Sequence, residues 1–281
     1  MSEEKLIKSV VSFQQYIFDE YKKLNPKELL FRGQSDKDWE LKPSIDRKGC
    51  SLLKYEPEMV NDMLKERPEE FEGIKDNLNL LAKMQHFGLP TRLLDVTKNL
   101  LVALYFACQG NFEKDGEVFI FTKVQKYPYR ATIVRIISSC YLSHKLNYIS
   151  SFLEELVIHK IITEFEKNNS LKYLFPQLGI CELFVEPKTF SERQNRQSAA
   201  FMLCENERYI NNDGVPVYKN NILNYKSWPA DDLGYRIIID GECKDSILWE
   251  LDKLGINEKF LFPELEHTAK YIKSVYMHKN D

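Results

Sequence analysis

The chain has 281 residues, of which 43% are hydrophobic and 29% charged, and its formal net charge at pH 7 is -3. A chain of this length and composition can bury a sizeable core as one large or two small globular domains. The small negative charge excludes a global basic field that would gather nucleic acid. A local basic groove around Lys123, Lys126, Arg130 and Arg135 remains open.

The cysteine and hydropathy patterns indicate a reduced, cytoplasmic protein. None of the six cysteines forms a CxxC pair, and Cys108, Cys181 and Cys204 lie in apolar runs, so we expect core thiols. No apolar run approaches the roughly 18 residues that a membrane span needs, and we expect no membrane partner. The amphipathic N-terminus contains Glu3 and Glu4, which a signal peptide would not.

Hydrophobic spacing predicts mainly helices in the first part of the chain and most of the strands after it. Apolar residues at helical spacing predict helices over residues 3–24, 74–86 and 100–108, with a short strand over 28–32 between the first two. The later elements are expected to be strands over 117–122 and 131–136, a helix over 150–166, strands over 180–186, 198–204 and 235–240, and helices over 244–254 and 262–277. This order favours an α+β fold. We expect one domain over residues 1–281, with an N-terminal helix (1–25) and a helical end (243–281).

The first motif with chemical content closes the strand at residue 31. Arg32 is a planar, permanently charged donor that suits bidentate binding of phosphate or carboxylate. Gly33 leaves room for the close approach of a ligand or of another backbone segment. The alternative is that Arg32 forms a structural ion pair at the end of the strand.

A second motif lies between the helices predicted at 74–86 and 100–108. Gln85, His86, Thr91, Arg92 and Asp95 occur within eleven positions there. Partly buried charges are costly unless they are paired, and such groups often mark a site. We expect Arg92 and Asp95 to converge on Arg32 in one cleft, although they can instead pair with each other or cap a helix. His86 can act as a general base or can cap the helix that it ends.

A third polar segment, residues 191–197, runs into an apolar strand. Gln197 stands at the junction and Arg193 lies four residues before it. A polar side chain at the start of a strand can face a cleft and hydrogen-bond a ribose. The alternative is an exposed loop whose charges are solvated.

Several common chemistries have no motif in this chain. There is no GxGxxG after a strand, no P-loop, no HExxH and no GxSxG, which argues against Rossmann dehydrogenases, P-loop NTPases, zincins and α/β-hydrolases. Cys140 and His144 form a lone CxxxH that is too sparse for zinc, and no metal site is predicted.

Together, these motifs resemble the FRG domain family, which is named for its Phe-Arg-Gly tripeptide. The resembling segments are Phe31–Gln34, a Leu-x-Pro-Ser-x-x-Arg run over 41–47, QHFGLPTRLLDVT over 85–97, ALYFA over 103–107, the Arg193 to Phe201 pattern and LFPEL over 261–265. The resemblance as a whole spans residues 28–272. Val96 replaces the usual Trp and changes one pocket wall, whereas Ala199 replaces the usual Gly and restricts how closely a ligand approaches the strand.

The order of these motifs is similar to that of ADP-ribosyltransferases. The resemblance implies an ADP-ribosyltransferase-like core of antiparallel strands with several surrounding helices. It also implies NAD as a substrate, with two sets of site residues. The NAD-binding set is Arg32, Gly33, Gln34, Thr91, Arg92 and Arg193. The catalytic set is Gln197, Asp95 and His86.

The resulting functional expectation is an NAD-dependent mono-ADP-ribosyltransferase that modifies a macromolecule, as a bacterial or phage toxin or defence effector. An antitoxin or another regulatory protein is then a candidate partner. The alternatives are an NAD glycohydrolase of the same fold, with water as the acceptor, and a non-catalytic module that binds a nucleotide or a partner protein. The sequence leaves the choice between a protein and a nucleic-acid acceptor open.

Overall fold

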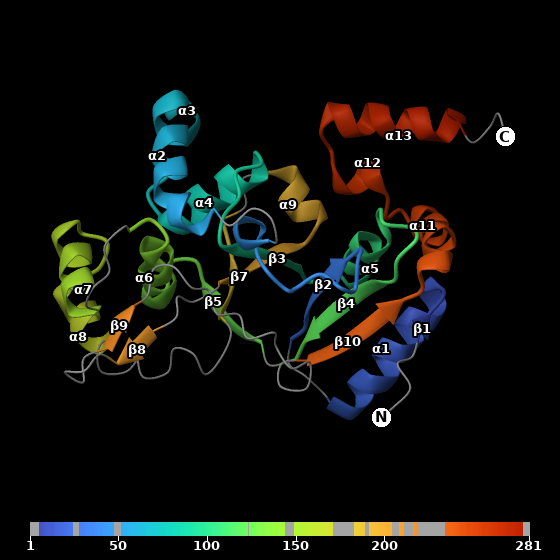
Figure 1. The fold of residues 1–281 in the computed structure, drawn as a ribbon, viewed down its shortest axis with the longest axis horizontal. Coiled ribbons are helices and arrows are strands. Elements are labelled where there is room, and N and C mark those ends of the chain that lie inside the picture. The colour runs from blue at the N-terminus through green and yellow to red at the C-terminus, as the bar shows by residue number, and fades with distance from the viewer. Residues whose placement is uncertain are drawn as a thin grey trace.

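A computed structural model describes residues 6–24, 28–47, 52–122, 124–143, 149–170, 183–188, 191–203, 208–210, 216–218 and 234–277. Its centre is an eight-stranded sheet in the order β1-β10-β4-β2-β3-β7-β6-β5 (Figure 1). The strands are β1 (Leu6–Ile7), β2 (Leu30–Gln34), β3 (Leu93–Thr97), β4 (Gly116–Phe121), β5 (Gln125–Pro128), β6 (Leu183–Glu186), β7 (Ala199–Leu203) and β10 (Gly234–Ile239). A separate pair is formed by β8 (Arg208–Ile210) and β9 (Pro216–Tyr218).

All neighbouring strands of the large sheet are antiparallel except the two outermost pairs, β1 with β10 and β5 with β6. The pairing is weakest in the middle. β2 pairs with β4 along its whole length, and β3 does so with β7, but β2 and β3 share a single register pair, Phe31 opposite Thr97. Beyond that pair the two strands diverge, so the sheet consists of two halves joined at one point.

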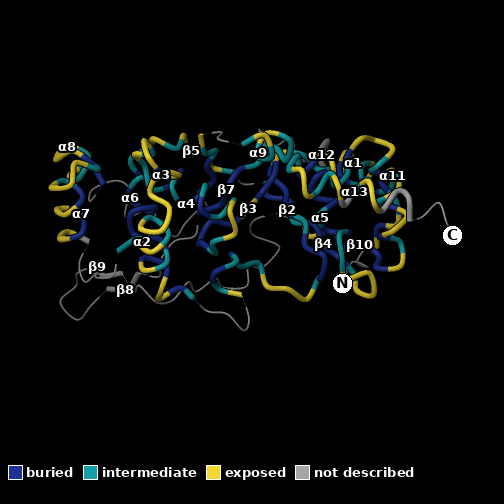
Figure 2. Tube along the Cα trace, turned by 90° about the horizontal axis from the view of Figure 1, so that it is seen from above, coloured by how far each residue is buried: buried dark blue, intermediate teal, exposed yellow. Residues whose placement is uncertain are grey.

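Each half of the sheet is covered by its own helices and has its own core, and a third core is shared between the halves through Leu30, Phe121, Leu94, Val96, Phe184, Ala200 and Met202. α1 (Val10–Leu24), α5 (Leu100–Cys108) and α11 (Lys244–Lys253) lie on the half that contains β2. The half that contains β3 carries α4 (Asn77–His86), α6 (Thr132–Cys140) and α7 (Ile149–Ile158), with α2 (Glu56–Glu66), α3 (Pro68–Phe71) and α8 (Glu164–Asn169) beside them. The short helices α9 (Glu192–Arg196) and α12 (Glu258–Leu261) lie near the junction, and α13 (Leu265–Met277) follows. Seen from above, the buried residues run along the sheet from one half to the other (Figure 2).

The α+β prediction is confirmed, and so are the strands at β2, β4, β7 and β10 and the helices at α4, α5 and α11. The strand expected over 131–136 is wrong, because this segment is α6. Its β-branched residues suggested a strand, but Ile133, Ile136, Ile137 and Cys140 follow helical spacing and form one buried face.

Four further elements differ from the sequence prediction. Leu6–Ile7 pairs with β10 as a strand, so the N-terminal helix begins only at Val10. The helix expected over 150–166 is divided after Ile158, where Lys160 has a left-handed φ of 58°, and α8 begins at a capping box on Thr163. Neither α2 nor the short strand β3 was predicted.

Cys108 and Cys140 are buried and Cys243 is half-buried, whereas Cys50, Cys181 and Cys204 lie outside the described residues. Residues 180–182 and 204 of the predicted strands also lie outside them. Within the described ranges, no helix has the length and apolar character that crossing a bilayer requires.

Gly33 allows α5 to pack directly against β2. A Cβ on Gly33 would lie 1.9 Å from the carbonyl oxygen of Ala103 and 2.7 Å from the backbone nitrogen of Ala107. Gly116 on β4 approaches the same helix, since its Cβ would lie 2.2 Å from the Ala107 carbonyl oxygen. Of the two uses predicted for Gly33, the structure therefore shows the close approach of another backbone segment, the helix α5.

Gly33→Ala should lower the free energy of unfolding by about 1–3 kcal/mol or more, the range for overpacked cores. The added methyl group would meet backbone atoms, so Ala103→Gly should not rescue it. Denaturant unfolding of the single and double variants measures both effects. An unchanged midpoint for Gly33→Ala, or full recovery in the double variant, would contradict the packing role.

Candidate functional site

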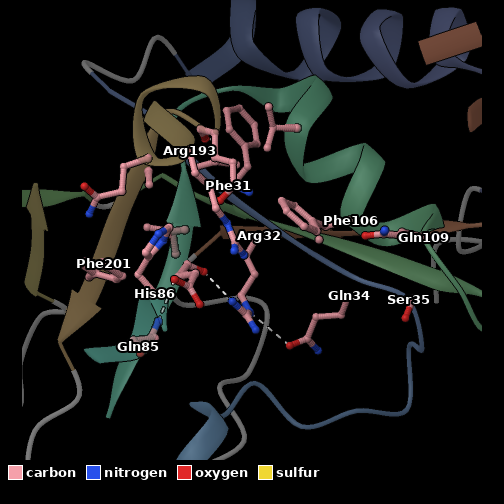
Figure 3. Close-up of a pocket in the computed structure, with 18 of the residues that line it drawn as sticks. Phe31, Arg32, Gln34, Ser35, Gln85, His86, Phe106, Gln109, Arg193 and Phe201 are labelled. Atoms are coloured by element: carbon pink, nitrogen blue, oxygen red, sulfur yellow. Dashed lines mark hydrogen bonds between the residues drawn. The ribbon is translucent and has the colours of Figure 1, made fainter. Parts of the chain in front are cut away.

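A cavity of about 350 Å³ lies where β2 and β3 diverge (Figure 3). This volume is at the lower end of the range for small-molecule sites. Its walls come from β2, β3, the start of β7, the end of α4, α5 and α9. Its polar and aromatic lining side chains include Arg32, Gln34, Trp39, Arg47, Gln85, His86, Asp95, Phe106, Arg193 and Gln197.

Arg32 spans the gap between the two strands. Its Nη1 donates to the backbone carbonyl oxygen of Asp95 at 2.6 Å, and its Nε donates to Oε1 of Gln34 at 3.3 Å. The side chain is buried, with 9% exposure. Since the strands no longer pair beyond Phe31 and Thr97, the guanidinium satisfies a β3 carbonyl that a continuous sheet would have bonded.

Gln34 is held so that its oxygen faces Arg32. Its Nε2 donates to Oε1 of Glu117 at 3.0 Å and to the carbonyl oxygen of Trp39 at 3.2 Å. Glu117 is fully buried and also pairs with Arg236 through its other oxygen. Burial raises the pKa of Glu117 to about 7, against the opposing effect of Arg236. With both amide hydrogens used on that side, only the Gln34 oxygen is left to accept from Arg32.

Asp95 presents an exposed carboxylate to the cavity, held by a short hydrogen-bond chain. Nε2 of Gln85 donates to Oδ1 of Asp95 at 2.8 Å. The hydroxyl of Thr91, which is fully buried, donates to Oε1 of Gln85. Thr91 thereby orients the Gln85 amide, and Gln85 in turn orients the carboxylate.

His86 and Arg193, which both line the cavity, flank the carboxylate of Glu264. Both His86 Nε2 and Arg193 Nη1 lie 4.0 Å from Oε1 of Glu264, and the guanidinium of Arg193 sits 4.6 Å from the centre of the Phe262 ring. Burial lowers the pKa of His86, and the charge of Arg193 lowers it further, while Glu264 raises it. The net effect favours the neutral imidazole at neutral pH, which is the form a general base needs.

Gln197 lines the same cavity at the turn between α9 and β7. It is the C-cap residue of α9, and its backbone carbonyl accepts from the hydroxyl of Thr97 at 2.7 Å. Its Nε2 donates to the carbonyl oxygen of Leu261 at 3.1 Å. The side chain therefore ties the end of α12 to the cavity.

The structure thus brings most of the predicted residues together and leaves two outside. Arg32, Gly33, Gln34, His86, Asp95, Arg193 and Gln197 all line the cavity, whereas Thr91 and Arg92 do not. Whether any of them binds NAD or catalyses a reaction stays a prediction. The sequence reasoning assigned no role to Trp39, Arg47 and Phe106, which line the cavity, or to Glu117 behind it. Two of these four residues carry a signal in the sequence: Arg47 closes a family motif, and Glu117 is an acid in an otherwise apolar strand.

The expectation that Arg92 converges on Arg32 is wrong. Arg92 is buried, and its Nε lies 2.6 Å from Oε2 of Glu56, while its backbone N–H donates to Oε1 of the same residue at 2.9 Å. Its guanidinium also lies 5.2 Å from the ring centre of Tyr141. Arg92 lies at a bend just before β3, where it is buried against Glu56, whereas Asp95 lies in the middle of β3 and lines the cavity.

Comparison with known protein families matches part of the chain that forms this cavity. The family model of the FRG domain matches residues 27–116, which include Arg32, Gly33, Gln34, His86 and Asp95. This confirms the resemblance for that range, whereas Arg193 and Gln197 lie beyond it. No curated protein and no solved structure matches the chain.

Arg92→Met should lower the free energy of unfolding by about 3–5 kcal/mol at neutral pH, because Glu56 would stay buried without its counter-charge. Burial already raises the pKa of Glu56 to about 7, against the opposing effect of Arg92. A carboxyl whose pKa is raised by folding favours the folded state at low pH and destabilises it as the pH rises. The loss should therefore shrink as the pH falls toward the unfolded value of about 4.3.

Denaturant unfolding across this pH range tests the pair. Glu56→Gln in the Arg92→Met background should recover part of the loss, because the amide oxygen can still accept the backbone N–H. Arg47→Met, which removes an exposed cation, is the matched control and should change stability little. A loss in Arg92→Met that is the same at every pH would show that the unpaired carboxyl is not its cause.

Proposed function

We propose that this FRG-domain protein binds NAD in the cavity between β2 and β3, breaks the bond between nicotinamide and ribose, and transfers the ADP-ribosyl group to a macromolecule. One observation carries the proposal. A single cavity holds permanently charged guanidinium groups, an exposed carboxylate and a histidine that favours its neutral form. These are the groups that a phosphate-bearing substrate with a cationic transition state requires.

The cations suit the pyrophosphate of NAD. Arg32 is fixed by two hydrogen bonds, and Arg193 is held over an aromatic ring, so neither needs much ordering when an anion binds. Arg47 is exposed at the rim, beside Trp39. Guanidinium groups bind phosphate oxygens in a bidentate geometry that a lysine cannot reproduce.

The carboxylate suits the developing charge on the ribose. When the C–N bond breaks, its electron pair neutralises the nicotinamide ring, and the ribose carbon becomes oxocarbenium-like. A fixed anion such as Asp95 stabilises that cation without reorganising. The acceptor then forms a bond to the ribose carbon, and neutral His86 can take the proton that the acceptor loses. Gln197 acts as a positioning residue through its bond to Leu261.

Two alternatives use the same cavity. Water can replace the macromolecule as acceptor, which would make the protein an NAD glycohydrolase, and the solvent exposure of Asp95 favours this version. A binding module would hold the nucleotide without cleaving it. Incubation with NAD separates the three: nicotinamide with a labelled macromolecule supports transfer, nicotinamide with free ADP-ribose supports hydrolysis, and neither product supports a binding module. A role as a toxin or anti-phage effector, held in check by a regulatory protein, rests on the family resemblance alone.

Asp95→Asn should reduce the rate of nicotinamide release on the order of a hundredfold, the magnitude typical of a lost electrostatic contact at a transition state. The amide keeps the size of the side chain and can still accept from Gln85, so NAD affinity should change much less. Asp38→Asn is the control, because Asp38 is an exposed acid beside Trp39 that does not line this cavity. Equal rates for Asp95→Asn and the wild type would remove Asp95 from the chemistry.

Gln197→Glu should impair nicotinamide release more than Gln197→Ala. The carboxylate would face the Leu261 carbonyl oxygen, which now accepts from the amide, and two acceptors repel each other. Gln197→Ala only removes the hydrogen bond to the Leu261 carbonyl oxygen. Steady-state kinetics on both variants measure the difference, and a Gln197→Glu enzyme as active as the wild type would show that the bond to Leu261 has no influence on the site.

A further inference from the structure

A second cavity, of about 540 Å³, opens at the other end of α4. Its lining residues are Gly73, Ile74, Lys75, Asp76, Asn79, Tyr129, Arg130, Arg135 and Lys188. Two of the four residues named for a local basic groove, Arg130 and Arg135, lie here. Of the other two, Lys126 is paired with Glu28 and Glu186, and Lys123 lies outside the described residues.

The charge of this basic cavity is strongly positive. Lys75, Arg130 and Lys188 come from three separate segments, and all three are exposed. Among the described residues none of the three has an acidic partner within ion-pair distance. Arg135 is neutralised by Glu166. The one lining acid is Asp76, whose two oxygens accept from the backbone and side-chain amides of Asn79 at 2.9 and 2.8 Å.

The walls beneath these cations are aromatic and apolar. Tyr129 and Ile74 are half-buried in the lining, and the guanidinium of Arg130 lies 5.3 Å from the ring centre of Tyr129. An aromatic face beside exposed cations is a feature with which proteins bind single-stranded nucleic acid, whose bases are free to stack. A phosphopeptide would instead call for a cluster of arginines, whereas Arg130 is the one described lining arginine without a carboxylate partner, since Arg135 is paired with Glu166. The observations therefore favour a nucleic-acid strand.

The basic cavity and the proposed NAD cavity are both lined by residues on one face of α4. Asn79 lines the basic cavity and His86 lines the NAD cavity. The two residues are seven positions apart, which is about two helical turns, so their side chains lie on the same face of α4. The distance between them along the helix is about 10 Å. Lys188 and Arg193, which lie five residues apart in the sequence, also line the basic and NAD cavities respectively.

We infer that the basic cavity binds the phosphates of a single-stranded nucleic acid, and that this strand is the acceptor of the ADP-ribosyl group. The second part rests on the proposed function, whereas the first does not. A strand held along α4 would place a nucleotide beside His86 and Asp95. A nitrogen or oxygen of that nucleotide forms the bond to the ribose carbon and gives its proton to His86, while nicotinamide leaves with the electrons of the broken bond.

Binding is tested without NAD, by fluorescence anisotropy on labelled single-stranded DNA and RNA of roughly 16 nucleotides. The test variant is Lys75→Glu with Arg130→Glu and Lys188→Glu. The control is Lys253→Glu with Lys259→Glu and Lys273→Glu, which changes net charge equally at the α11–α13 end of the molecule (Figure 1). We expect the test variant to lose roughly tenfold or more in affinity and about 2 units of salt slope, and the control to bind like the wild type. Wild-type protein that binds neither strand, or equal losses in both variants, would overturn the strand site.

Transfer is tested with radiolabelled NAD and the same oligonucleotides. We expect label on the strand with wild-type and control protein, and at least a tenfold loss with the test variant, while nicotinamide release without a strand stays equal in all three. Label on protein alone would overturn the assignment of the acceptor. A nucleic-acid strand that binds in the basic cavity while NAD stays intact would show that the proposed chemistry is wrong. The assignment of the basic cavity as a nucleic-acid site would still hold.

Discussion

The guanidinium of Arg32 is the interaction on which the candidate site depends. β2 and β3 hydrogen-bond at a single register pair, so a cavity can open between them only if the backbone groups freed by their divergence find other partners. Arg32 supplies one such partner by donating 2.6 Å across the gap to the carbonyl of Asp95. The same contact fixes the backbone of the residue whose carboxylate faces the cavity. One side chain therefore keeps the gap open and places both charges.

The amide side chains of Gln34 and Gln85 orient Arg32 and Asp95 respectively. Gln34 uses its N–H groups on Glu117 and Trp39 and leaves its oxygen for Arg32, while Gln85 accepts from Thr91 and donates to Asp95. Each amide is thus held in one orientation by a partner that is itself buried or part of the backbone. Groups fixed in this way need no reorganisation when a charged ligand arrives, which is the condition for strong electrostatic stabilisation in an enzyme site.

The sequence predicted the site better than it predicted the path of the chain through it. Arg32 at a strand end and Gln197 at a strand start both line the cavity, and the local pattern singled them out only together with the family resemblance. Arg92 was misplaced because the strand β3, which begins at the next residue, is too short for its sequence to predict it, so the pattern placed the segment only between two helices. Glu56 could not be recognised as its partner, since a contact between positions 36 residues apart leaves no local trace. The helix α6 was missed because β-branched composition outweighed spacing.

A nucleotide bound in this cavity, as proposed, would have a structural role as well as a chemical one, because the sheet is divided there. The half that contains β2 packs around α5 and α11, and the half that contains β3 packs around α4 and α6. A third core joins them, because Leu30 and Phe121 of the first half pack with residues of the second half such as Phe184. Arg32 and Phe106 belong to the first half, whereas His86 and Asp95 belong to the second. A ligand that contacts both sets adds a connection where the strands themselves provide a single pair. Because a ligand that binds only the folded state stabilises it by mass action, occupancy of this cavity would add to the shared core and the single β2–β3 register pair that already join the two halves.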